Sequence, residues 1–533
     1  MTHGMSRRQS PVGAGASAPA PLIETRVDTR LAIAGALMLV LLAYANFFHN
    51  SFHFDDSHVI VENPAIRSLA NVPRFFTDAH TFSSLPSNST YRPLVTLSFA
   101  LDYAVRHSLD PVPFHVTQLV LLLITGALLV FVSRDVLGKE HMTLAIAAAA
   151  LFCVHTANTE TMNFLSSRSE LLSAVGFLAA FLIFVRHYRY PWYLIPLAIG
   201  ALAKAPVVIF AGIVIAWVRL IERKPMMKAV TAAVPSFVTG IVLLIALNAM
   251  NAREWVAGGA SRLGYLMTQP YIWLHYARLS LLPVGLSADT DLEILPHWYD
   301  TNAIAGYVFV ALLCVAIVKL GRSARTAPIA FGLAWFAITL LPASSIFPLA
   351  EVANEHRLFF PLMGFAIAAV AAIQLIPRQR LAYAGLAIFI VALAFGTHVR
   401  NRAWLTEETL WRDVTIKSPH NGRGWMNYGL TQMEAGRYAD AKALFERAAR
   451  YTPNYSTLEI NRGIVAAALG ENAEAERLFK RGLDLKPDRN AHFYYARFLV
   501  RAGRIEEARI HLHAASTAAP NWLPPRELMA ALR

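Results

Sequence analysis

The chain has 533 residues, of which 56% are hydrophobic and 16% charged, with a mean hydropathy of +0.42. This composition excludes an ordinary soluble globular protein and indicates a polytopic membrane protein. The formal net charge of +13 does not indicate nucleic-acid binding, because Lys and Arg fall in short clusters between apolar runs, as topology determinants do. Cys153 and Cys314 both lie inside apolar segments, so we expect no disulfide framework.

The N-terminal region consists of a tail and a first membrane span. Residues 1–30 are rich in Gly, Ala, Pro and Ser and predict a disordered, positively charged cytoplasmic tail. The uncharged run from Leu31 to Phe48 is close to the length needed to cross about 30 Å of hydrocarbon. A long region precedes this run and aromatic residues end it, so we interpret it as a retained span and not as a signal peptide.

Further apolar segments alternate with basic turns. We place spans at 114–132, 143–157, 171–185, 191–203, 205–221, 229–249, 303–320, 327–342, 357–376 and 381–398. The turns that this alternation assigns to the cytoplasm carry Arg134 and Lys139, Arg186 and Arg189, Arg219, Arg223, Lys224 and Lys228, Lys319, Arg322 and Arg325, and Arg378 and Arg380. The pattern predicts about eleven spans in a domain over residues 31–400, with residues 401–533 on the non-cytoplasmic side.

One apolar stretch, 264–286, does not fit the alternation. It contains Pro270 and Pro283, and irregular backbone at membrane depth is tolerated only where protein or a cavity covers it. We expect it to be re-entrant, interfacial or a doubled half-helix.

Two adjacent carboxylates, Asp55 and Asp56, follow the first span directly. Ionisable side chains near hydrocarbon are costly, which favours a functional role over a solvated loop. Successive side chains of an extended chain point in opposite directions, so one Asp should meet substrate while the other orients the loop. We favour Asp55 as a general base, because its place nearest the membrane should desolvate it and raise its pKa most.

The other external loops add acids and guanidinium groups, which are candidate substrate-binding residues: Arg92, Glu160, Arg168, Glu355 and Arg357. Carboxylates transfer protons and bind sugar hydroxyls, whereas guanidinium groups bind phosphate. Each residue could instead cap a helix or anchor at the lipid headgroups. His53 and His58 flank the Asp pair and could hold a divalent metal with it, but this spacing is tied to no single geometry, so we assign no metal site.

The last part of the chain, residues 401–533, is charged and repetitive. Gly429, Ala441, Phe445, Ala448 and Pro453 recur as Gly463, Ala475, Phe479, Gly482 and Pro487, and again as Ala496, Ala508, Leu512, Ala515 and Pro520. A period of about 34 residues, ending in Pro, predicts tetratricopeptide repeats, and Trp411 and Pro419 indicate a preceding half-repeat. Such arrays stack into an α-solenoid whose concave face often holds extended peptides, so we expect no catalytic role here.

Several motifs together resemble the transmembrane-and-tetratricopeptide-repeat O-mannosyltransferases and their bacterial relatives. They are Asp55-Asp56 with Asn63-Pro64, Tyr91-Arg92-Pro93-Leu94, His155-Thr156 with Thr159-Glu160, Ser-Arg-Ser-Glu-Leu-Leu at 167–172, and Glu355-His356-Arg357-Leu358-Phe359-Phe360-Pro361. The resemblance covers nearly the whole chain from about residue 31. Two departures, Ala157 in place of Val and Lys204-Ala205-Pro206 in place of Lys-Glu, concern the donor geometry.

This resemblance implies a GT-C glycosyltransferase fold, here an all-α membrane helix bundle followed by the solenoid. In that fold a lipid-phosphate-linked sugar enters from the membrane and the first external loop supplies an acidic catalytic residue. It implies Asp55 or Asp56 as that acid, Arg92 or Arg168 at the lipid phosphate, and Glu355 with Arg357 lining the cavity.

The sequence therefore predicts a multi-pass glycosyltransferase of the inner cell membrane. It would transfer mannose or a similar hexose from a polyprenyl-phosphate-linked donor to a hydroxyl of a polypeptide or a glycan, on the non-cytoplasmic side. One alternative is a non-catalytic scaffold that presents the repeats for envelope assembly, although an anchor needs only one span. A transporter is a third alternative. A transporter should show internal hydropathy symmetry and charged residues within its spans, whereas this sequence shows no convincing symmetry and carries its charges in the loops.

Overall fold

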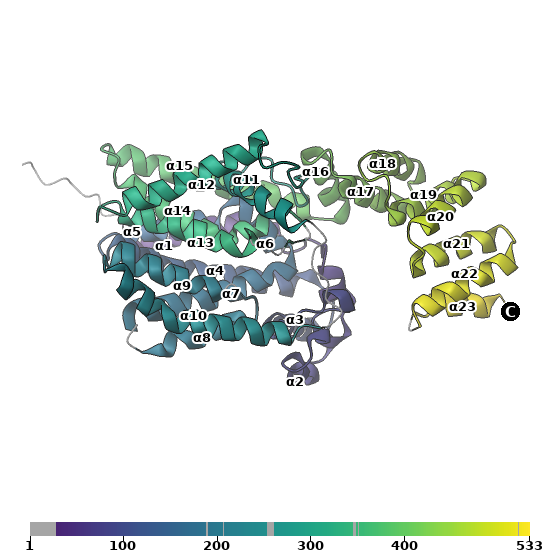
Figure 1. The fold of residues 1–533 in the computed structure, drawn as a ribbon, viewed down its shortest axis with the longest axis horizontal. Helices are drawn as coiled ribbons and strands as arrows, with labels where there is room; N and C mark the ends of the chain where they lie inside the picture. Colours follow the sequence, from purple (N-terminus) through teal and green to yellow (C-terminus); the bar gives the residue numbers. More distant parts are fainter. Residues whose placement is uncertain are drawn as a thin grey trace, which may run out of the picture.

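The computed structural model describes residues 28–187, 190–205, 207–252, 261–344, 348–349, 351–520 and 522–532. Within these ranges the chain is helical and contains no strand, as predicted (Figure 1). A bundle of long helices is followed by an α-solenoid at one of its ends. The predicted N-terminal tail lies outside the described residues as far as residue 27.

Helices of the bundle lie at the positions of all the predicted spans. Its helices are α1 (Thr29–Ala43), α4 (Pro111–Leu137), α5 (Met142–Cys153), α6 (Thr159–Asn163), α7 (Arg168–His187), α8 (Leu194–Ala201), α9 (Val207–Ala216), α10 (Met226–Ala249), α11 (Arg262–Leu281), α12 (Thr301–Leu320), α13 (Ala327–Leu340), α14 (Phe359–Ile373) and α15 (Gln379–Asn401). Among the described residues, 7 helices are long and apolar enough to cross a membrane, or up to 8 if α5 and α6 form one bent span. Shorter apolar helices at Thr29–Ala43, Pro191–Ala201 and Ile209–Ile221 match the remaining predicted segments. The chain is thus a multi-pass membrane protein, and the count of about eleven crossings stays a prediction.

The basic turns gather at one end of the bundle. Arg186 forms an ion pair with Asp135 at 3.2 Å, which joins the last helical turns of α4 and α7. Arg223 donates from Nη2 to the carbonyl oxygen of Arg322 at 2.7 Å, which joins the turns before α10 and after α12. The loops that carry the candidate site residues lie at the opposite end, beside the solenoid (Figure 1).

Helix α11 accounts for the stretch that did not fit the alternation. It is one continuous helix with Pro270 inside it, so the doubled half-helix is wrong. Tyr265 near its start donates to the carbonyl oxygen of Ala343 at 2.6 Å, and near its end the carbonyl oxygen of Ser280 lies 3.0 Å from His155 Nε2. Both halves of α11 therefore contact the loop end of the bundle, which favours an interfacial helix over a crossing.

The loop between α1 and α4 is a compact layer of short helices, including α2 (Val72–Phe75) and α3 (Pro93–Arg106). Asn63 organises this layer: its amide donates to the carbonyl oxygens of Val59 and Thr81, each at 3.0 Å, and its Oδ1 accepts from the Ala65 backbone N–H at 3.0 Å. The Asn63-Pro64 motif is therefore a structural element that folds the loop bearing Asp55.

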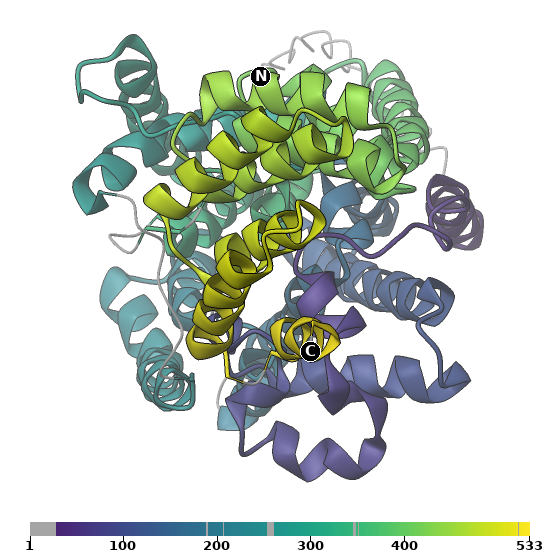
Figure 2. The same ribbon diagram turned by 90° about the vertical axis from the view of Figure 1, so that its right-hand side faces the viewer.

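The solenoid consists of antiparallel helix pairs in the predicted register. Its helices are α16 (Glu407–Lys417), α17 (Gly422–Glu434), α18 (Tyr438–Tyr451), α19 (Ser456–Ala468), α20 (Asn472–Leu485), α21 (Arg489–Arg501), α22 (Ile505–Ala518) and α23 (Pro524–Ala531). A side chain at Gly429 would collide with Phe445, and one at Gly463 would crowd Phe479, which explains the small residue at this repeat position. Figure 2 shows the solenoid lying across the loop end of the bundle.

Candidate functional site

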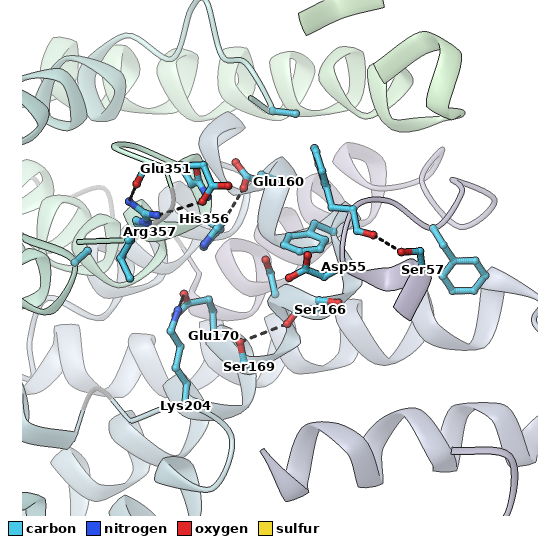
Figure 3. A pocket seen from close by; sticks show the side chains of 18 of the residues that line it. Asp55, Ser57, Glu160, Ser166, Ser169, Glu170, Lys204, Glu351, His356 and Arg357 are labelled. Atoms are coloured by element: carbon cyan, nitrogen blue, oxygen red, sulfur yellow. Dashed lines mark hydrogen bonds and ion pairs between the residues drawn. The ribbon is translucent and has the colours of Figure 1, made fainter. Parts of the chain in front are cut away.

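A cavity of about 1100 Å³ lies between the loop end of the bundle and the first helices of the solenoid (Figure 3). The bundle contributes a wall of acids, bases and hydroxyls that includes Asp55, Arg92, Glu160, Glu170, Lys204, His356 and Arg357. The solenoid contributes a second wall from α16 and α17, with Glu407, Trp411, Arg423, Asn427, Leu430, Thr431 and Glu434. Of the seven predicted site residues, the cavity brings together four: Asp55, Arg92, Glu160 and Arg357.

Asp55 points into this cavity from the loop between α1 and α4 (Figure 3). Its side chain is 57% exposed, and His58 Nε2 lies 3.4 Å from its Oδ1. Burial acts to raise the pKa of Asp55, but the hydrogen bond and charge of His58 and the charge of Arg92 outweigh it, so the pKa lies below the usual value. The carboxylate is therefore ionised and available as a hydrogen-bond acceptor at neutral pH.

Asp56 faces the opposite way and is fully buried. One of its oxygens accepts from the backbone N–H and the hydroxyl of Ser166, each at 2.7 Å, and the other accepts from the N–H groups of Leu165 and His53 at 3.1 and 3.2 Å. Burial raises the pKa of Asp56 to about 6, against the effect of these hydrogen bonds. The expectation that Asp55 has the more strongly raised pKa is therefore wrong, because Asp56 is the desolvated member of the pair.

Glu160 and His356 form the floor of the cavity nearest the bundle (Figure 3). The Glu160 carboxylate lies 2.6 Å from His356 Nδ1 and accepts from the backbone N–H of Glu355 at 2.9 Å. Glu355 itself lies behind this floor, borders a second cavity of about 190 Å³, and its carboxylate has no hydrogen-bond partner among the described residues. Glu355 thus supports the site through its backbone. Contrary to the expectation from the sequence, it does not line the large cavity.

The two candidate phosphate ligands, Arg92 and Arg168, are held in different ways. The Arg92 guanidinium borders the cavity over the Phe82 ring, at 5.2 Å, and donates no hydrogen bond to any described residue. Arg168 is fully buried outside the cavity wall, ion-paired with Asp102 and bonded to Gln118 Oε1 at 3.0 Å and the Phe114 carbonyl oxygen at 2.8 Å. Its donors are therefore committed, and only Arg92 has a free guanidinium edge for an anionic ligand.

Two further cations border the cavity. Arg357 donates to the backbone carbonyl oxygen of Glu351 at 2.9 Å, so one edge of its guanidinium is committed to the adjoining loop. Lys204 forms an ion pair with Glu170 at the start of α7. In the sequence the Lys204 segment stands out only as a departure from the family motif, which gives no sign of its place in the site.

The metal site considered for His53 and His58 is not formed. His58 Nδ1 lies 3.0 Å from the Ser83 hydroxyl, whereas both ring nitrogens of His53 contact residues near the start of α16. No group of three or more His, Cys, Asp or Glu side chains among the described residues is arranged to hold a metal ion.

Sequence reasoning also missed the solenoid wall of the cavity. It expected no catalytic role for the repeats, yet Glu407 and Trp411 of α16 face the same space as Asp55. Arg423 fixes this wall to the bundle through two hydrogen bonds to the Asp289 carboxylate, at 2.7 and 2.8 Å. The predicted placement of both elements on one side of the membrane was the single sequence signal that pointed to their proximity.

Comparison with known proteins agrees with this architecture. A tetratricopeptide-repeat family model matches residues 432–494 and 466–532. The chain is 25% identical to protein O-mannosyl-transferase Tmtc3 of Drosophila melanogaster over 84% of its own length and 58% of that protein. Mouse TMTC3 shares 25% identity over 84% of the chain and 54% of its own length, and a Caenorhabditis elegans protein O-mannosyl-transferase shares 27% over 79% and 62%. The chain therefore spans about three fifths of the length of these relatives, and the resemblance inferred from its motifs is confirmed.

Among solved structures, the chain aligns with the crystal structure of the APC/C hetero-tetramer Cut9–Hcn1 at 13% identity. The alignment covers 82% of the chain and 96% of that chain, with a TM-score of 0.24. This likeness is too distant to carry an argument.

Proposed function

We propose that the protein is a glycosyltransferase that moves mannose or a similar hexose from a polyprenyl-phosphate-linked donor to a hydroxyl of a polypeptide. The observation that carries this proposal is the pairing, in one cavity, of an ionised and exposed Asp55 with an Arg92 whose guanidinium has no hydrogen-bond partner among the described residues. The names of the relatives support the reaction class and a protein acceptor.

The donor would enter along the bundle wall. This wall combines apolar side chains from α9 and α14, among them Ile209 and Phe360, with the cationic groups of Arg92 and Lys204. An apolar surface suits a polyprenyl chain, and a guanidinium fork matches phosphate oxygens bidentately. The phosphate would therefore sit near Arg92, with the sugar directed toward Asp55.

Asp55 is suited to the role of general base. It would accept the proton of the acceptor hydroxyl as that oxygen forms a bond to the sugar anomeric carbon. The bond from this carbon to the phosphate oxygen breaks, and the polyprenyl phosphate departs with the negative charge. Arg92 and Lys204 would stabilise that charge, and the phosphate needs no general acid because it is a good leaving group.

The acceptor would approach along the solenoid wall. Arg423, Asn427, Thr431 and Glu434 lie on one face of α17 and extend about 16 Å along the cavity. That length matches about five residues of extended polypeptide, whose N–H and C=O groups an Asn side chain can bind. We assign the cavity end of the bundle to the non-cytoplasmic face of the inner membrane, because the basic turns occupy the other end.

The test is sugar transfer from a synthetic polyprenyl-phosphate donor to a peptide by the purified protein. Asp55→Asn keeps the size of the side chain but removes its basicity, so transfer should fall about 10²- to 10⁴-fold while folding is retained. Glu62→Gln, which neutralises an exposed carboxylate of the same loop outside the cavity, is the matched control. Wild-type transfer by Asp55→Asn would reject the catalytic role of the loop and favour the non-catalytic scaffold.

A further inference from the structure

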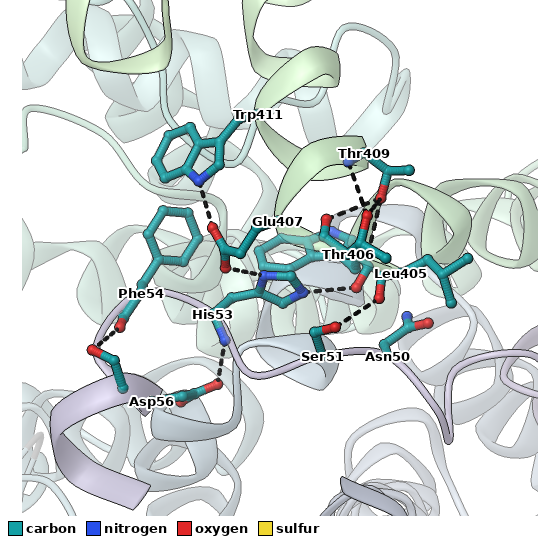
Figure 4. A network of polar contacts seen from close by, with 12 residues as sticks. Asn50, Ser51, His53, Phe54, Asp56, Leu405, Thr406, Glu407, Thr409 and Trp411 are labelled. Atoms are coloured by element: carbon teal, nitrogen blue, oxygen red, sulfur yellow. Dashed lines mark hydrogen bonds and ion pairs between the residues drawn. The ribbon is translucent and has the colours of Figure 1, made fainter. Parts of the chain in front are cut away.

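The first helix of the solenoid is joined to the loop bearing Asp55 through a buried histidine (Figure 4). His53 is 1% exposed, and its two ring nitrogens contact residues from the start of the solenoid. Nδ1 lies 2.7 Å from Oε1 of Glu407, and Nε2 lies 2.7 Å from the carbonyl oxygen of Trp404. The backbone N–H and hydroxyl of Ser51 add hydrogen bonds to the carbonyl oxygen of Leu405, at 3.2 and 3.0 Å.

Glu407 is itself fixed on its other side. Its Oε2 accepts a hydrogen bond from the indole N–H of Trp411 at 2.5 Å, one helical turn further along α16. The side chain is 42% exposed and borders the large cavity. Glu407 therefore links His53 of the loop to Trp411 of α16.

These contacts use both ring nitrogens of His53. One nitrogen faces the Glu407 carboxylate and the other faces the Trp404 carbonyl oxygen. If either partner were lost, a buried polar group would be left unsatisfied, because neither ring nitrogen is open to water.

The residue between His53 and Asp55 shows why this contact matters for the site. Phe54 has a positive φ of 52°, which is unfavourable for a bulky residue. Its ring packs edge-on against Trp411 at 5.3 Å and Phe164 at 5.6 Å. A strained residue persists only where surrounding contacts hold it. Here those contacts, like those of His53, come in part from α16, so the solenoid helps determine the course of the chain into Asp55.

We infer that Glu407 is a positioning residue of the transfer reaction. Through its contact with the His53 ring it holds the loop bearing Asp55 so that Asp55 faces the acceptor hydroxyl, which makes the first helix of the solenoid an integral part of the active site. This inference rests on the proposed role of Asp55. It assigns the solenoid a function in catalysis that is separate from any binding of the acceptor along α17.

The experiment combines transfer kinetics with hydrogen exchange on the full-length protein, for Glu407→Gln, His53→Gln and the double variant. Each single variant should lower kcat about 10- to 100-fold, because misplacing a reacting group by about 1 Å has an effect of that size, while the donor KM stays within about twofold. The double variant should be no worse than the poorer single variant, since both remove one interaction. Amides of residues 51–58 should exchange faster in all three variants.

Glu408→Gln is the matched control, because Glu408 lies in the same turn of α16 and, among the described residues, pairs with the exposed Arg437 alone. Two results would overturn the inference. One is a Glu407→Gln protein with the kcat and the hydrogen exchange of the wild type, and the other is a double variant in which the losses of the two single variants add. If Glu407→Gln fails to fold, Trp411→Phe removes one hydrogen bond from Glu407 and should lower kcat about 3- to 10-fold. An unchanged kcat in Trp411→Phe would then overturn it.

Asp55→Asn, measured in parallel, separates this inference from the proposed function. If Asp55→Asn loses transfer while Glu407→Gln keeps it, the proposed function stands and the positioning role falls. If Asp55→Asn keeps transfer, the proposed function falls. The contact between Glu407 and His53 is then tested by hydrogen exchange alone, and unchanged exchange over residues 51–58 in Glu407→Gln would show that it does not hold the loop.

Discussion

The surface of the large cavity and the polar layer behind it contain the same kinds of residue in opposite situations. At the cavity surface, Asp55 is exposed and Arg92 donates no hydrogen bond to the described residues. In the supporting layer, Asp56 accepts four hydrogen bonds and Arg168 is tied to Asp102 and its neighbours. The difference teaches that unused hydrogen-bonding capacity, and not residue type, distinguishes groups that can bind substrate from groups that hold the site together.

The physical reason for the division is the cost of burial. A charge removed from water must be paired and fully hydrogen-bonded. Its donors or acceptors are then committed within the protein and cannot bind a ligand. A charge at the wall of a wet cavity keeps its solvation and can exchange water for substrate. Substitutions in the supporting layer should therefore affect folding, whereas substitutions at the cavity surface should affect turnover.

The largest effect on stability is expected for Arg168→Gln. The change leaves Asp102 buried without its partner, so the free energy of unfolding should fall by about 3–5 kcal/mol. Denaturant unfolding in detergent measures this loss, and adding Asp102→Asn should restore part of it. A stable Arg168→Gln protein with a raised donor KM would place Arg168 at the phosphate. It would contradict the division between residues of the supporting layer and residues of the cavity surface.

A smaller, pH-dependent effect is expected for Asp56→Asn. The pKa of Asp56 is raised from 3.8 to about 6 in the folded protein, so the folded state holds the proton more tightly than the unfolded chain. The stability of the wild type relative to the variant should therefore fall as pH rises from about 4 to about 6, by up to roughly 3 kcal/mol, and stay level above that range. Unfolding curves of the two proteins across this pH range test the prediction. Parallel curves would show that Asp56 is not desolvated.

The smallest effect is expected for Arg92→Lys. Lysine keeps the positive charge but cannot bind two phosphate oxygens through a planar fork, so the donor KM should rise about tenfold with little change in kcat. Arg74→Lys is the control, because Arg74 is exposed in the same loop and pairs with Asp78 at 3.3 Å, away from the cavity. An unchanged donor KM in Arg92→Lys would move the phosphate contact to another cation.

The sequence was sufficient for the fold because its signals are local. Apolar runs and basic turns placed the bundle helices, and the residues that recur at Gly429 and Gly463 placed the solenoid helices. Asp55 and Asp56 diverge as the alternation argument predicts, but the extended chain that it assumed is absent: Phe54 has a φ of 52° and Asp56 begins a helical turn with φ −58° and ψ −27°.

The roles of individual site residues could not be predicted, because they depend on contacts between distant segments. Asp56 is buried by Ser166, and Arg168 is neutralised by Asp102, pairings that no periodicity encodes. The pKa of Asp55 is lowered and not raised for the same reason, because the hydrogen bond and charge of His58 and the charge of Arg92 outweigh the effect of burial. The solenoid wall of the cavity arises from the docking of two regions and has no motif of its own.

The central claim is that Arg92 and Asp55 face one substrate from the same cavity. Its most direct test is a cryo-electron microscopy structure of the protein with a non-transferable polyprenyl-phosphate sugar analogue. The phosphate should lie within about 3 Å of the Arg92 guanidinium, with the anomeric carbon on the side of Asp55. A phosphate bound at Arg168, or at the basic turns of the opposite end, would contradict the account.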